Sequence, residues 1–208
     1  MEEKNYGHKP VLLEESLRAL DIKPGGTYVD GTLGRAGHSL AILRRLEGGR
    51  LIGIDRDQSA IDAARERLAD FADRVTLVHG NFQDLGDILR DLGVRRVDGM
   101  LFDLGVSSPQ LDEPERGFSY MHDAPLDMRM DTSASLDAAQ VVNTWSYEEL
   151  RRILYEYGEE RFAPQIARAI VRRREEGPIA ATGELVELIR SAMPAAALRE
   201  KQHPAKRT

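Results

Sequence analysis

The sequence predicts an α/β protein in which a parallel sheet, covered by helices, is followed by a smaller helical region. Two observations carry this prediction. Short apolar runs alternate with amphipathic helical patterns through the first half of the chain, and from residue 105 on this alternation gives way to irregular and then helical sequence. Strands of a parallel sheet are buried on both faces, which explains why the runs are continuously apolar. We therefore expect an α/β core over residues 1–112 and a loop and helical domain over residues 113–208.

The elements of the core are expected in the following order. Pro10 opens a first helix, because proline is favoured in the first helical turn. Four apolar segments are the expected strands: 28–30, 51–55, 75–78 and 97–102. Apolar stripes at helical spacing predict a helix after each of the first three strands: Leu40, Leu43 and Leu46; Ile61, Ala64, Leu68 and Phe71; Leu85, Ile88, Leu89 and Leu92. Asp57 is the expected N-cap of the second of these helices.

The second region begins with a long irregular segment. Residues 105–131 follow neither a helical nor an alternating pattern, but their large apolar side chains argue against disorder, so a functional loop is expected. Three helices are expected beyond it. Ser146 and Glu149 form a capping-box pattern for the first, residues 162–176 form the second, and Thr182 is expected to cap the third.

Composition restricts the class of protein. Apolar residues make up 41% and charged residues 31% of the 208 residues, as in globular rather than disordered chains. No apolar run reaches the ~18 residues of a membrane span, and the polar, acidic start does not resemble a signal peptide. Because cysteine is absent and the histidines show no metal-binding spacing, no metal is expected. The cytoplasm is the expected location, with no membrane association.

Charge is distributed unevenly along the chain. The net charge of −6 argues against nucleic acid as a partner for the chain as a whole. Residues 145–208, however, hold 12 Lys and Arg against 10 Asp and Glu, which is compatible with a local nucleic-acid contact. The arginine run 172–174, together with Arg161 and Arg168, is the expected contact with RNA phosphates. A solvated helix face is the alternative reading of this run.

A glycine-rich turn, VDGTLGRAGHS at 29–39, joins the first expected strand to a helix. Gly34 and Gly37 would let the backbone approach a ligand closely, and His38 is placed to contact a cofactor. No phosphate-binding Gly-Lys-Ser/Thr follows. Taken alone, the turn is also consistent with tight packing and no ligand.

Polar residues close the four expected strands: Asp30, Asp55, Asn81 and Asp103. Because ligands of α/β sheets bind at the carboxyl ends of the strands, these side chains are expected at one edge. Asp55 stands where a carboxylate accepts hydrogen bonds from both hydroxyls of a ribose, a group that NAD and S-adenosylmethionine share. Asn81 and Phe82 can hydrogen-bond to and stack on adenine. The missing G-x-G-x-x-G spacing and the acidic rim favour S-adenosylmethionine, a sulfonium cofactor, over NAD.

The segment after the fourth strand reads DLGVSSPQ. Methyl transfer to an exocyclic amine needs acceptors around the amine's N–H groups, since these orient the nitrogen lone pair. Ser107, Ser108 and the carbonyls around Pro109 are expected to be these acceptors, because proline also removes one backbone donor. We therefore predict that Asp103, Ser107, Ser108 and Pro109 are the catalytic residues; a plain Ser-Pro turn is the alternative.

Two missing residue types favour an amine as the methyl acceptor. Ring-carbon methylation of cytosine generally uses a cysteine, which the chain lacks, and ribose methylation commonly uses a lysine, which is absent from residues 24–200. An amine needs neither, provided that its base is held out of the stack. Phe118 or Tyr120 is expected to stack on that base.

Nine stretches resemble the bacterial 16S ribosomal RNA cytosine-N4 methyltransferases, the RsmH/MraW family. They are HKPVLLEE at 8–15, VDGTLGRAGHS at 29–39, IDRD at 54–57, HGNF at 79–82, DLGVSSPQLD at 103–112, ERGFSY at 115–120, PLDMRMD at 125–131, YGEERFA at 157–163 and HPAKRT at 203–208. The resemblance implies a Rossmann-like class I methyltransferase core with an inserted helical domain. It implies methyl transfer from S-adenosylmethionine to N4 of a cytosine in 16S ribosomal RNA, with the small ribosomal subunit as partner. It also implies cofactor contacts by Ala36, Gly37, His38, Asp55, Phe82, Asp103 and Gln110.

Two departures from the family pattern lead to further expectations. The family usually has glycine in place of Ala36, so a methyl group is expected to crowd the cofactor slightly. Family chains continue past HPAKRT and return to the core, so the later core strands are expected to be absent, the chain to be a fragment and the fourth strand to lie at an open edge. An inactive cofactor-binding fragment or a nicotinamide-dependent oxidoreductase are the alternatives to a methyltransferase.

Overall fold

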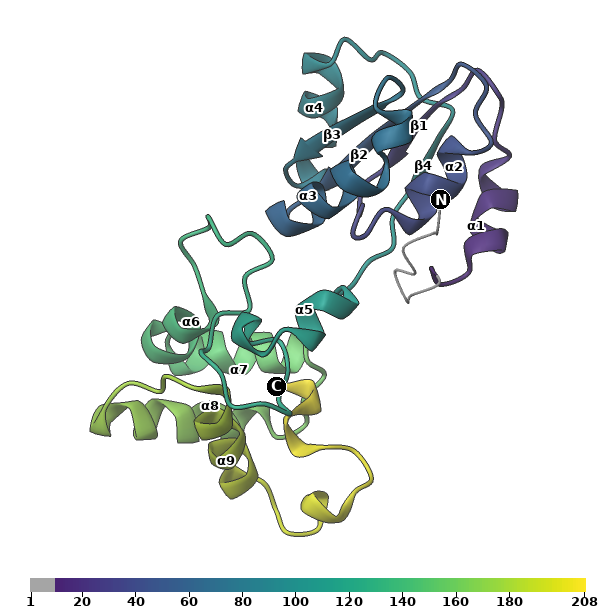
Figure 1. Cartoon of the computed structure of the whole chain (residues 1–208). Helices are drawn as coiled ribbons and strands as arrows, with labels where there is room; N and C mark the ends of the chain where they lie inside the picture. Colours follow the sequence, from purple (N-terminus) through teal and green to yellow (C-terminus); the bar gives the residue numbers. More distant parts are fainter. Residues whose placement is uncertain (1–9) are drawn as a thin grey trace. The chain divides into compact units, whose positions relative to one another are not determined.

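The computed structural model describes residues 10–208, and the chain falls into two compact units (Figure 1). Unit 1 ends at Gly105 and unit 2 comprises Val106–Thr208. By packing, residues 106–112 therefore go with the second unit. The assignment of residues 1–112 to cofactor binding concerns function and stays a prediction. His8, the first residue of the HKPVLLEE stretch, lies outside the described residues.

Unit 1 contains the parallel sheet that the sequence predicts. Its strands are β1 (Thr27–Asp30), β2 (Arg50–Asp55), β3 (Val75–His79) and β4 (Gly99–Leu101), in the order β3-β2-β1-β4. Val29 of β1 lies between Ile52 of β2 and Met100 of β4. β4 lies at an edge of the sheet, as expected. The strand order reverses between β1 and β4, and ligands of such sheets bind outside the carboxyl ends of the strands at this reversal.

The helices of unit 1 are α1 (Leu13–Leu20), α2 (Gly37–Leu43), α3 (Gln58–Arg67) and α4 (Leu85–Asp91), with single 3-10 turns at Ala69–Phe71 and Phe82–Asp84. Asp57 caps α3 as predicted, because its Oδ1 accepts from the N–H of Ser59 at 3.0 Å. The prediction that Pro10 opens α1 is wrong. The helix begins three residues later, and the Pro10 ring packs so closely on Gly37 that a Cβ there would collide with it.

Two apolar clusters fill unit 1. Tyr28 and Leu51 belong to the first, together with buried residues of α1, α2 and α3. Val29 and Ile52 belong to the second, against which Ile88 and its neighbours in α4 pack. Successive strand residues point to opposite faces of a sheet, so the two clusters cover opposite faces. This two-faced burial is what the continuously apolar strand sequences predict.

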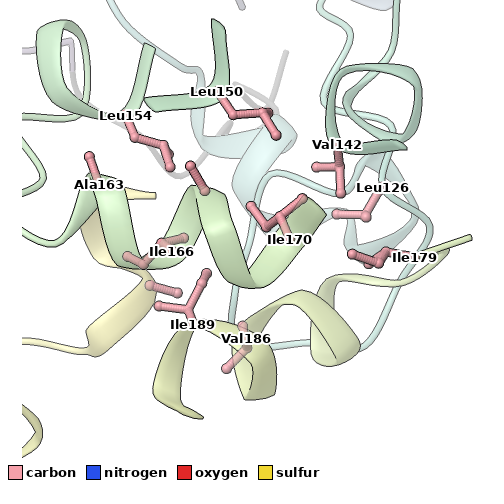
Figure 2. Packing of buried hydrophobic residues seen from close by; sticks show 12 residues of the cluster. Leu126, Val142, Leu150, Leu154, Ala163, Ile166, Ile170, Ile179, Val186 and Ile189 are labelled. Atoms are coloured by element: carbon pink, nitrogen blue, oxygen red, sulfur yellow. The ribbon is translucent and has the colours of Figure 1, made fainter. Parts of the chain in front are cut away.

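Unit 2 is built from helices: α5 (Ser108–Asp112), α6 (Ala138–Thr144), α7 (Tyr147–Glu156), α8 (Ala163–Arg173) and α9 (Thr182–Ala192), with 3-10 turns at Pro114–Arg116, Arg174–Glu176, Ala197–Arg199 and Pro204–Arg207. Figure 2 shows Leu150 of α7, Ile170 of α8 and Ile189 of α9 converging on one apolar cluster. Leu126 and Ile179, which lie outside the helices, are buried in the same cluster. The irregular segments are therefore anchored to the helical core.

The predicted helix starts of unit 2 are partly correct. The Ser146 N–H donates to the Glu149 side chain at 2.8 Å, so the predicted capping box forms, and this hydrogen bond lowers the pKa of Glu149. Thr182 does not cap α9. Its hydroxyl donates to the His122 carbonyl at 2.6 Å and accepts from the Ala124 N–H at 3.0 Å, so it joins α9 to a distant segment. α6, capped by the Asp137 side chain, was not predicted.

Two further searches cover the described part of the chain only. Within residues 10–208, no helix has the length and apolar character needed to cross a membrane. In the same range, no three His, Cys, Asp or Glu side chains come together as metal ligands would.

Candidate cofactor site and catalytic segment

Asp55, at the end of β2, is held in place by two backbone N–H groups. Its Oδ2 accepts from Gly34 at 2.8 Å and its Oδ1 accepts from Asp57 at 2.9 Å. The side chain is only half-buried, and each carboxylate oxygen can accept a further hydrogen bond. Asp55 is thus an oriented carboxylate with capacity for two more donors, which is what two neighbouring ribose hydroxyls offer.

The turn between β1 and α2 closes around this carboxylate. Gly34 and Ala36 both have left-handed backbone, with φ of +48° and +57°. The Leu33 N–H donates to the Ile54 carbonyl at 3.0 Å, which ties the turn to the end of β2. Ala36 is fully buried in the apolar cluster of α2 and α3, so its methyl group lies in the core. The expectation that this methyl would crowd the cofactor is therefore wrong.

His38 and Gly37 lie next to the segment that precedes α1. The buried His38 side chain has its Nε2 3.1 Å from the Val11 carbonyl, and in the tautomer protonated at Nε2 it donates to that oxygen. Gly37 is covered by the Pro10 ring. This contact occupies Nε2 and leaves Nδ1 and the backbone of His38 for a contact with the cofactor. The cofactor contacts of Gly37 and His38 stay predictions.

Two phenylalanines form an apolar wall at the same edge. Phe82 follows β3 and Phe102 follows β4; their ring centroids are 5.5 Å apart with an edge-to-face angle of 67°. The Phe102 ring lies over Gly31, where any Cβ would collide with it. Both rings remain partly exposed, at 38% and 41%. Sequence reasoning missed Phe102, although a glycine directly after β1 is a signal that a large neighbour approaches closely.

Asn81 has a different local role from the one expected. Its Oδ1 accepts from the Gln83 N–H at 3.1 Å, so it caps the short 3-10 turn that starts with Phe82. This cap fixes the position of the Phe82 ring. The amide group of Asn81 retains its two N–H donors for a ligand.

Asp30 and Asp103 end neighbouring strands but lie in opposite surroundings. Asp30 is 1% exposed, and burial raises the pKa of its carboxyl while a hydrogen bond from Ser39 at 2.6 Å opposes the rise. Asp30 is therefore not on the rim where the sequence reading put it. Asp103 is exposed, and its backbone N–H donates to Thr32 Oγ1 at 2.7 Å. The Thr32 N–H in turn donates to Asp30 at 3.2 Å. The buried Asp30 therefore helps to place the exposed Asp103 through Thr32.

The SSPQ segment is helical, contrary to the expectation of an irregular loop. Ser107 and Gln110 form a capping box in which the Ser107 N–H donates to Gln110 Oε1 at 3.0 Å, and Pro109 occupies the first turn of α5. The Ser107 and Pro109 carbonyls accept from Leu111 and Glu113 at 3.3 and 2.9 Å. The expected carbonyl acceptors are therefore used within the helix. The S-x-x-Q pattern with proline inside it was the sequence signal for this helix.

Three of the predicted residues in this segment keep a possible role in the site. Ser107 and Ser108 are half-buried and carry hydroxyl groups, so their catalytic role stays a prediction. Gln110 is 5% exposed and is engaged in the capping box. Its predicted contact with the cofactor is likewise untested.

Arginine clamps organise the rest of the long segment. Arg129 donates from Nε to Asp127 Oδ1 at 3.0 Å and from a terminal nitrogen to Oδ2 at 2.6 Å, and this pairing lowers the pKa of Asp127. Arg129 also donates to the carbonyls of Thr132 and Ala134 at 3.1 and 2.9 Å. Arg116 binds the carbonyl of Arg129 at 3.0 Å. The PLDMRMD stretch therefore has a structural role that its sequence pattern alone did not reveal.

The two rings expected to stack on a base already have partners in unit 2. Tyr120 stacks on His203 with centroids 4.4 Å apart and an angle of 8°, and the Arg116 guanidinium lies 5.9 Å from the Phe118 ring centre. The ERGFSY and HPAKRT stretches thus meet. Tyr120 remains 37% exposed, and base stacking by either ring stays a prediction.

The arginine run 172–174 divides into one exposed and two structural residues. Arg173 pairs with Glu184 and donates to the Gly177 carbonyl at 3.0 Å, and Arg174 donates to the Val142 carbonyl at 2.9 Å. Only Arg172 of the three is exposed. Arg173 and Arg174 thus help to hold unit 2 together, and the contact of the arginine run with RNA phosphates stays a prediction.

Comparison with known proteins places this geometry in context. The ribosomal RNA small subunit methyltransferase H of Brevibacillus brevis is 60% identical over 205 residues, which are 98% of this chain and 65% of that protein. The protein of the same name from Symbiobacterium thermophilum is 56% identical over 204 residues, 98% of this chain and 64% of that protein. The chain thus spans just under two thirds of the length of these curated relatives.

A solved structure, a ribosomal RNA methylase from Streptococcus thermophilus, aligns with 64% of this chain and 83% of that one at 20% identity and a TM-score of 0.37. This likeness is too low to bear on fold or function. The sequence profile of the MraW methylase family, by contrast, matches residues 5–208. From this match and the two close relatives, it follows that the chain belongs to the MraW methylase family.

Proposed function

We propose that this protein transfers a methyl group from S-adenosylmethionine to the exocyclic N4 amine of a cytosine in 16S ribosomal RNA. Family membership supports methyl transfer, and the names of the relatives support small-subunit ribosomal RNA as the substrate. The observation that carries the proposal is the oriented, half-buried Asp55 carboxylate beside the strand-order reversal of the sheet. The cytosine N4 atom rests on the sequence resemblance.

The residues of unit 1 fit S-adenosylmethionine. Asp55 would accept from the two ribose hydroxyls, and the Phe82 and Phe102 rings would provide an apolar wall for adenine. The exposed Asp103 carboxylate suits a ligand with positive charge. When bound, the cofactor supplies an electrophilic methyl group. Gly34 contributes indirectly, since its N–H holds Asp55 in place.

The amine needs acceptors because its lone pair is otherwise delocalised into the ring. With the carbonyls of Ser107 and Pro109 and the Ser107 side chain engaged in α5, we assign this role to the Asp103 carboxylate. The nitrogen would bond to the methyl carbon as the bond from that carbon to the departing thioether sulfur breaks, and it would then carry positive charge and have to release a proton. An exposed carboxylate stabilises that charge and passes the proton to water. We assign this role to Asp103, oriented through its backbone by Thr32.

The proposed substrate also determines the proposed location and partner. Ribosomal RNA is modified where ribosomes are assembled, so we assign the protein to the cytoplasm, with 16S ribosomal RNA in the small subunit as its partner.

Nucleoside mass spectrometry of 16S ribosomal RNA tests the proposal. In a strain that lacks the protein, N4-methylated cytidine should disappear and should return when the wild-type gene is restored. A gene carrying Asp103→Asn should restore it poorly, whereas Asp112→Asn, which changes an exposed acid of α5, should restore it fully. Undiminished N4-methylated cytidine in the deletion strain, with loss of another methylated nucleoside, would contradict the proposal.

A further inference from the structure

Five side chains lie together along one flank of the α7–α8 hairpin. Tyr147, Arg151 and Tyr155 follow one another at four-residue spacing on α7, and Arg168 and Arg172 do so on α8, so each is the surface neighbour of the next. The two rows are joined where the Arg168 guanidinium lies 5.9 Å from the centre of the Tyr147 ring. These five residues are called the Tyr-Arg face below.

The arginines of the Tyr-Arg face differ from most others in unit 2. Arg151, Arg168 and Arg172 are exposed, and none makes an ion pair within residues 10–208. Most other arginines of the unit are held by a partner within it: Arg129 by Asp127, Arg152 by Glu156, Arg161 by Glu200, Arg173 by Glu184, Arg190 by Glu187, Arg207 by Glu159, and Arg116 and Arg174 by backbone carbonyls. Unpaired guanidinium groups are thus concentrated on this flank.

Few acidic residues without a partner lie on the two helices of the face. α8 contains no acidic residue. On α7, Glu149 is engaged with Ser146 and Glu156 with Arg152, which leaves Glu148 as the acid of that helix without such a partner among the described residues. Glu175 and Glu176 follow α8 in a 3-10 turn, three and four residues after Arg172, so the positive charge of the face rests mainly on Arg151 and Arg168, within a chain whose net charge is −6.

We infer that the Tyr-Arg face binds single-stranded RNA. This surface would extend the contact with the substrate beyond the reacting base. The inference rests on the proposed function, since it gives the ribosomal RNA substrate a second point of attachment. Arginines spaced along a helix suit successive phosphates. The Tyr155 ring, 67% exposed, offers a stacking surface for a base, which an acidic protein partner would not require. Charge and aromatic surface together therefore favour RNA over protein.

Fluorescence anisotropy with a labelled, cytosine-containing single-stranded RNA oligonucleotide, titrated at several salt concentrations, tests the inference. The face variant carries Arg151→Ala, Arg168→Ala and Arg172→Ala. The matched control carries Arg152→Ala, Arg161→Ala and Arg190→Ala, which removes the same charge from exposed, ion-paired positions. The face variant should lower the slope of log affinity against log salt by about 2, because each phosphate contact on a single strand contributes about 0.7. The control should leave the slope unchanged.

The aromatic part of the face is tested separately. Tyr155→Ala should weaken binding about tenfold through loss of stacking, and Tyr155→Phe should retain wild-type affinity. Because Tyr155 is exposed, neither change should affect folding, which circular dichroism checks. An equal loss of slope in both triple variants, or no loss in either, would overturn the inference. A face variant that keeps its RNA affinity but loses binding to proteins of the small subunit would overturn it as well.

The two proposals fail in distinguishable ways. If substitutions on the Tyr-Arg face leave RNA affinity unchanged, the RNA-binding surface is refuted. The N4-methylated cytidine measurement still tests the reaction independently. The converse outcome is RNA binding that depends on the face while the deletion strain keeps its N4-methylated cytidine. That result would contradict the proposed reaction and support the RNA-binding surface.

Discussion

The two units hold three of their aspartates in different ways. In unit 1, Asp30 and Asp55 are fixed by backbone N–H groups and a serine hydroxyl, and neither forms an ion pair among the described residues. In unit 2, Asp127 accepts from one backbone N–H, that of Arg129 at 2.9 Å, and is also held by the Arg129 guanidinium, which binds two backbone carbonyls as well. Strand ends and tight turns supply oriented N–H groups from the backbone itself. In the irregular segment the backbone supplies Asp127 with a single N–H, and a guanidinium adds the further donors.

The largest expected effect comes from removing the side-chain clamp. Arg129→Ala removes the guanidinium donors of a half-buried carboxylate and of the carbonyls of Thr132 and Ala134, leaving Asp127 only the backbone N–H of residue 129, so we expect a loss of about 2–3 kcal/mol in the free energy of unfolding. Hydrogen exchange of the backbone amides of residues 125–134 reports on unit 2 directly and should speed up accordingly. Arg152→Ala, which breaks an exposed pair with Glu156, should cost under about 0.5 kcal/mol. Similar losses in the two variants would contradict the distinction between a clamp and a surface pair.

The backbone-based arrangement in unit 1 is tested at Thr32. Thr32→Val keeps the side-chain shape but removes the acceptor of the Asp103 N–H, so Asp103 should lose its orientation. We expect S-adenosylmethionine affinity to fall by roughly 1 kcal/mol, the usual net value of one hydrogen bond. Thr32→Ser should retain affinity because the hydroxyl remains. Calorimetric titration measures these affinities, and Asp103→Ala provides the control. Adding Thr32→Val to Asp103→Ala should not weaken S-adenosylmethionine binding further, because the side chain that Thr32 orients is already gone.

The contrast between the units also explains what could be predicted from the sequence. In unit 1, β1 to β4 and the Asp57 cap follow from local apolar periodicity and helix-start chemistry, and the edge that carries Asp55 follows from sheet topology. In unit 2, contacts distant in sequence decide the structure. Thr182 reads as a cap but binds His122 and Ala124, and this pairing has no local signal.

The same reasoning applies to the candidate site. Asp55 was found because its position after β2 has a physical meaning, whereas Phe102 depends on its contact with Gly31 across neighbouring strands. The helix at Ser108–Asp112 was predictable from its capping box and was overlooked because the same residues suit an irregular turn.

Asp30 of unit 1 and Asp127 of unit 2 should contribute to the pH dependence of stability with opposite signs. Burial raises the pKa of Asp30 above its ordinary 3.8, so its contribution to stability is present below that value and is lost as pH rises through the raised pKa. Arg129 lowers the pKa of Asp127, so that contribution is present above 3.8 and is lost as pH falls. Relative to wild type, Asp30→Asn should therefore gain stability with rising pH and Asp127→Asn should lose it. Urea unfolding across a pH series measures both, and curves that move in the same direction would refute the contrast.

The smallest expected effect concerns the strained turn of unit 1. Ala36→Gly relieves the strain of a left-handed conformation, which costs about 1–2 kcal/mol in alanine. It also removes a buried methyl that stabilises the fold by about 0.8 kcal/mol, and it adds freedom to the unfolded chain. The net change in the free energy of unfolding should lie within about 1 kcal/mol of zero. Ala64→Gly, equally buried but within helix α3, should cost about 2 kcal/mol because no strain is relieved. Equal losses at the two positions would show that the turn is not strained.

Binding of S-adenosylmethionine to wild type and to Asp55→Ala, measured by isothermal titration calorimetry, tests the central claim most directly. Asp62→Ala, at an exposed acid of α3, is the control, and NAD is the competing ligand. If the Asp55 carboxylate binds the ribose, Asp55→Ala should weaken S-adenosylmethionine by roughly 1.5–3 kcal/mol, the range for hydrogen bonds to a charged group. Asp62→Ala should bind as wild type does, and NAD should bind weakly to all three proteins. Unchanged affinity in Asp55→Ala, or tighter binding of NAD than of S-adenosylmethionine, would contradict the proposed cofactor site.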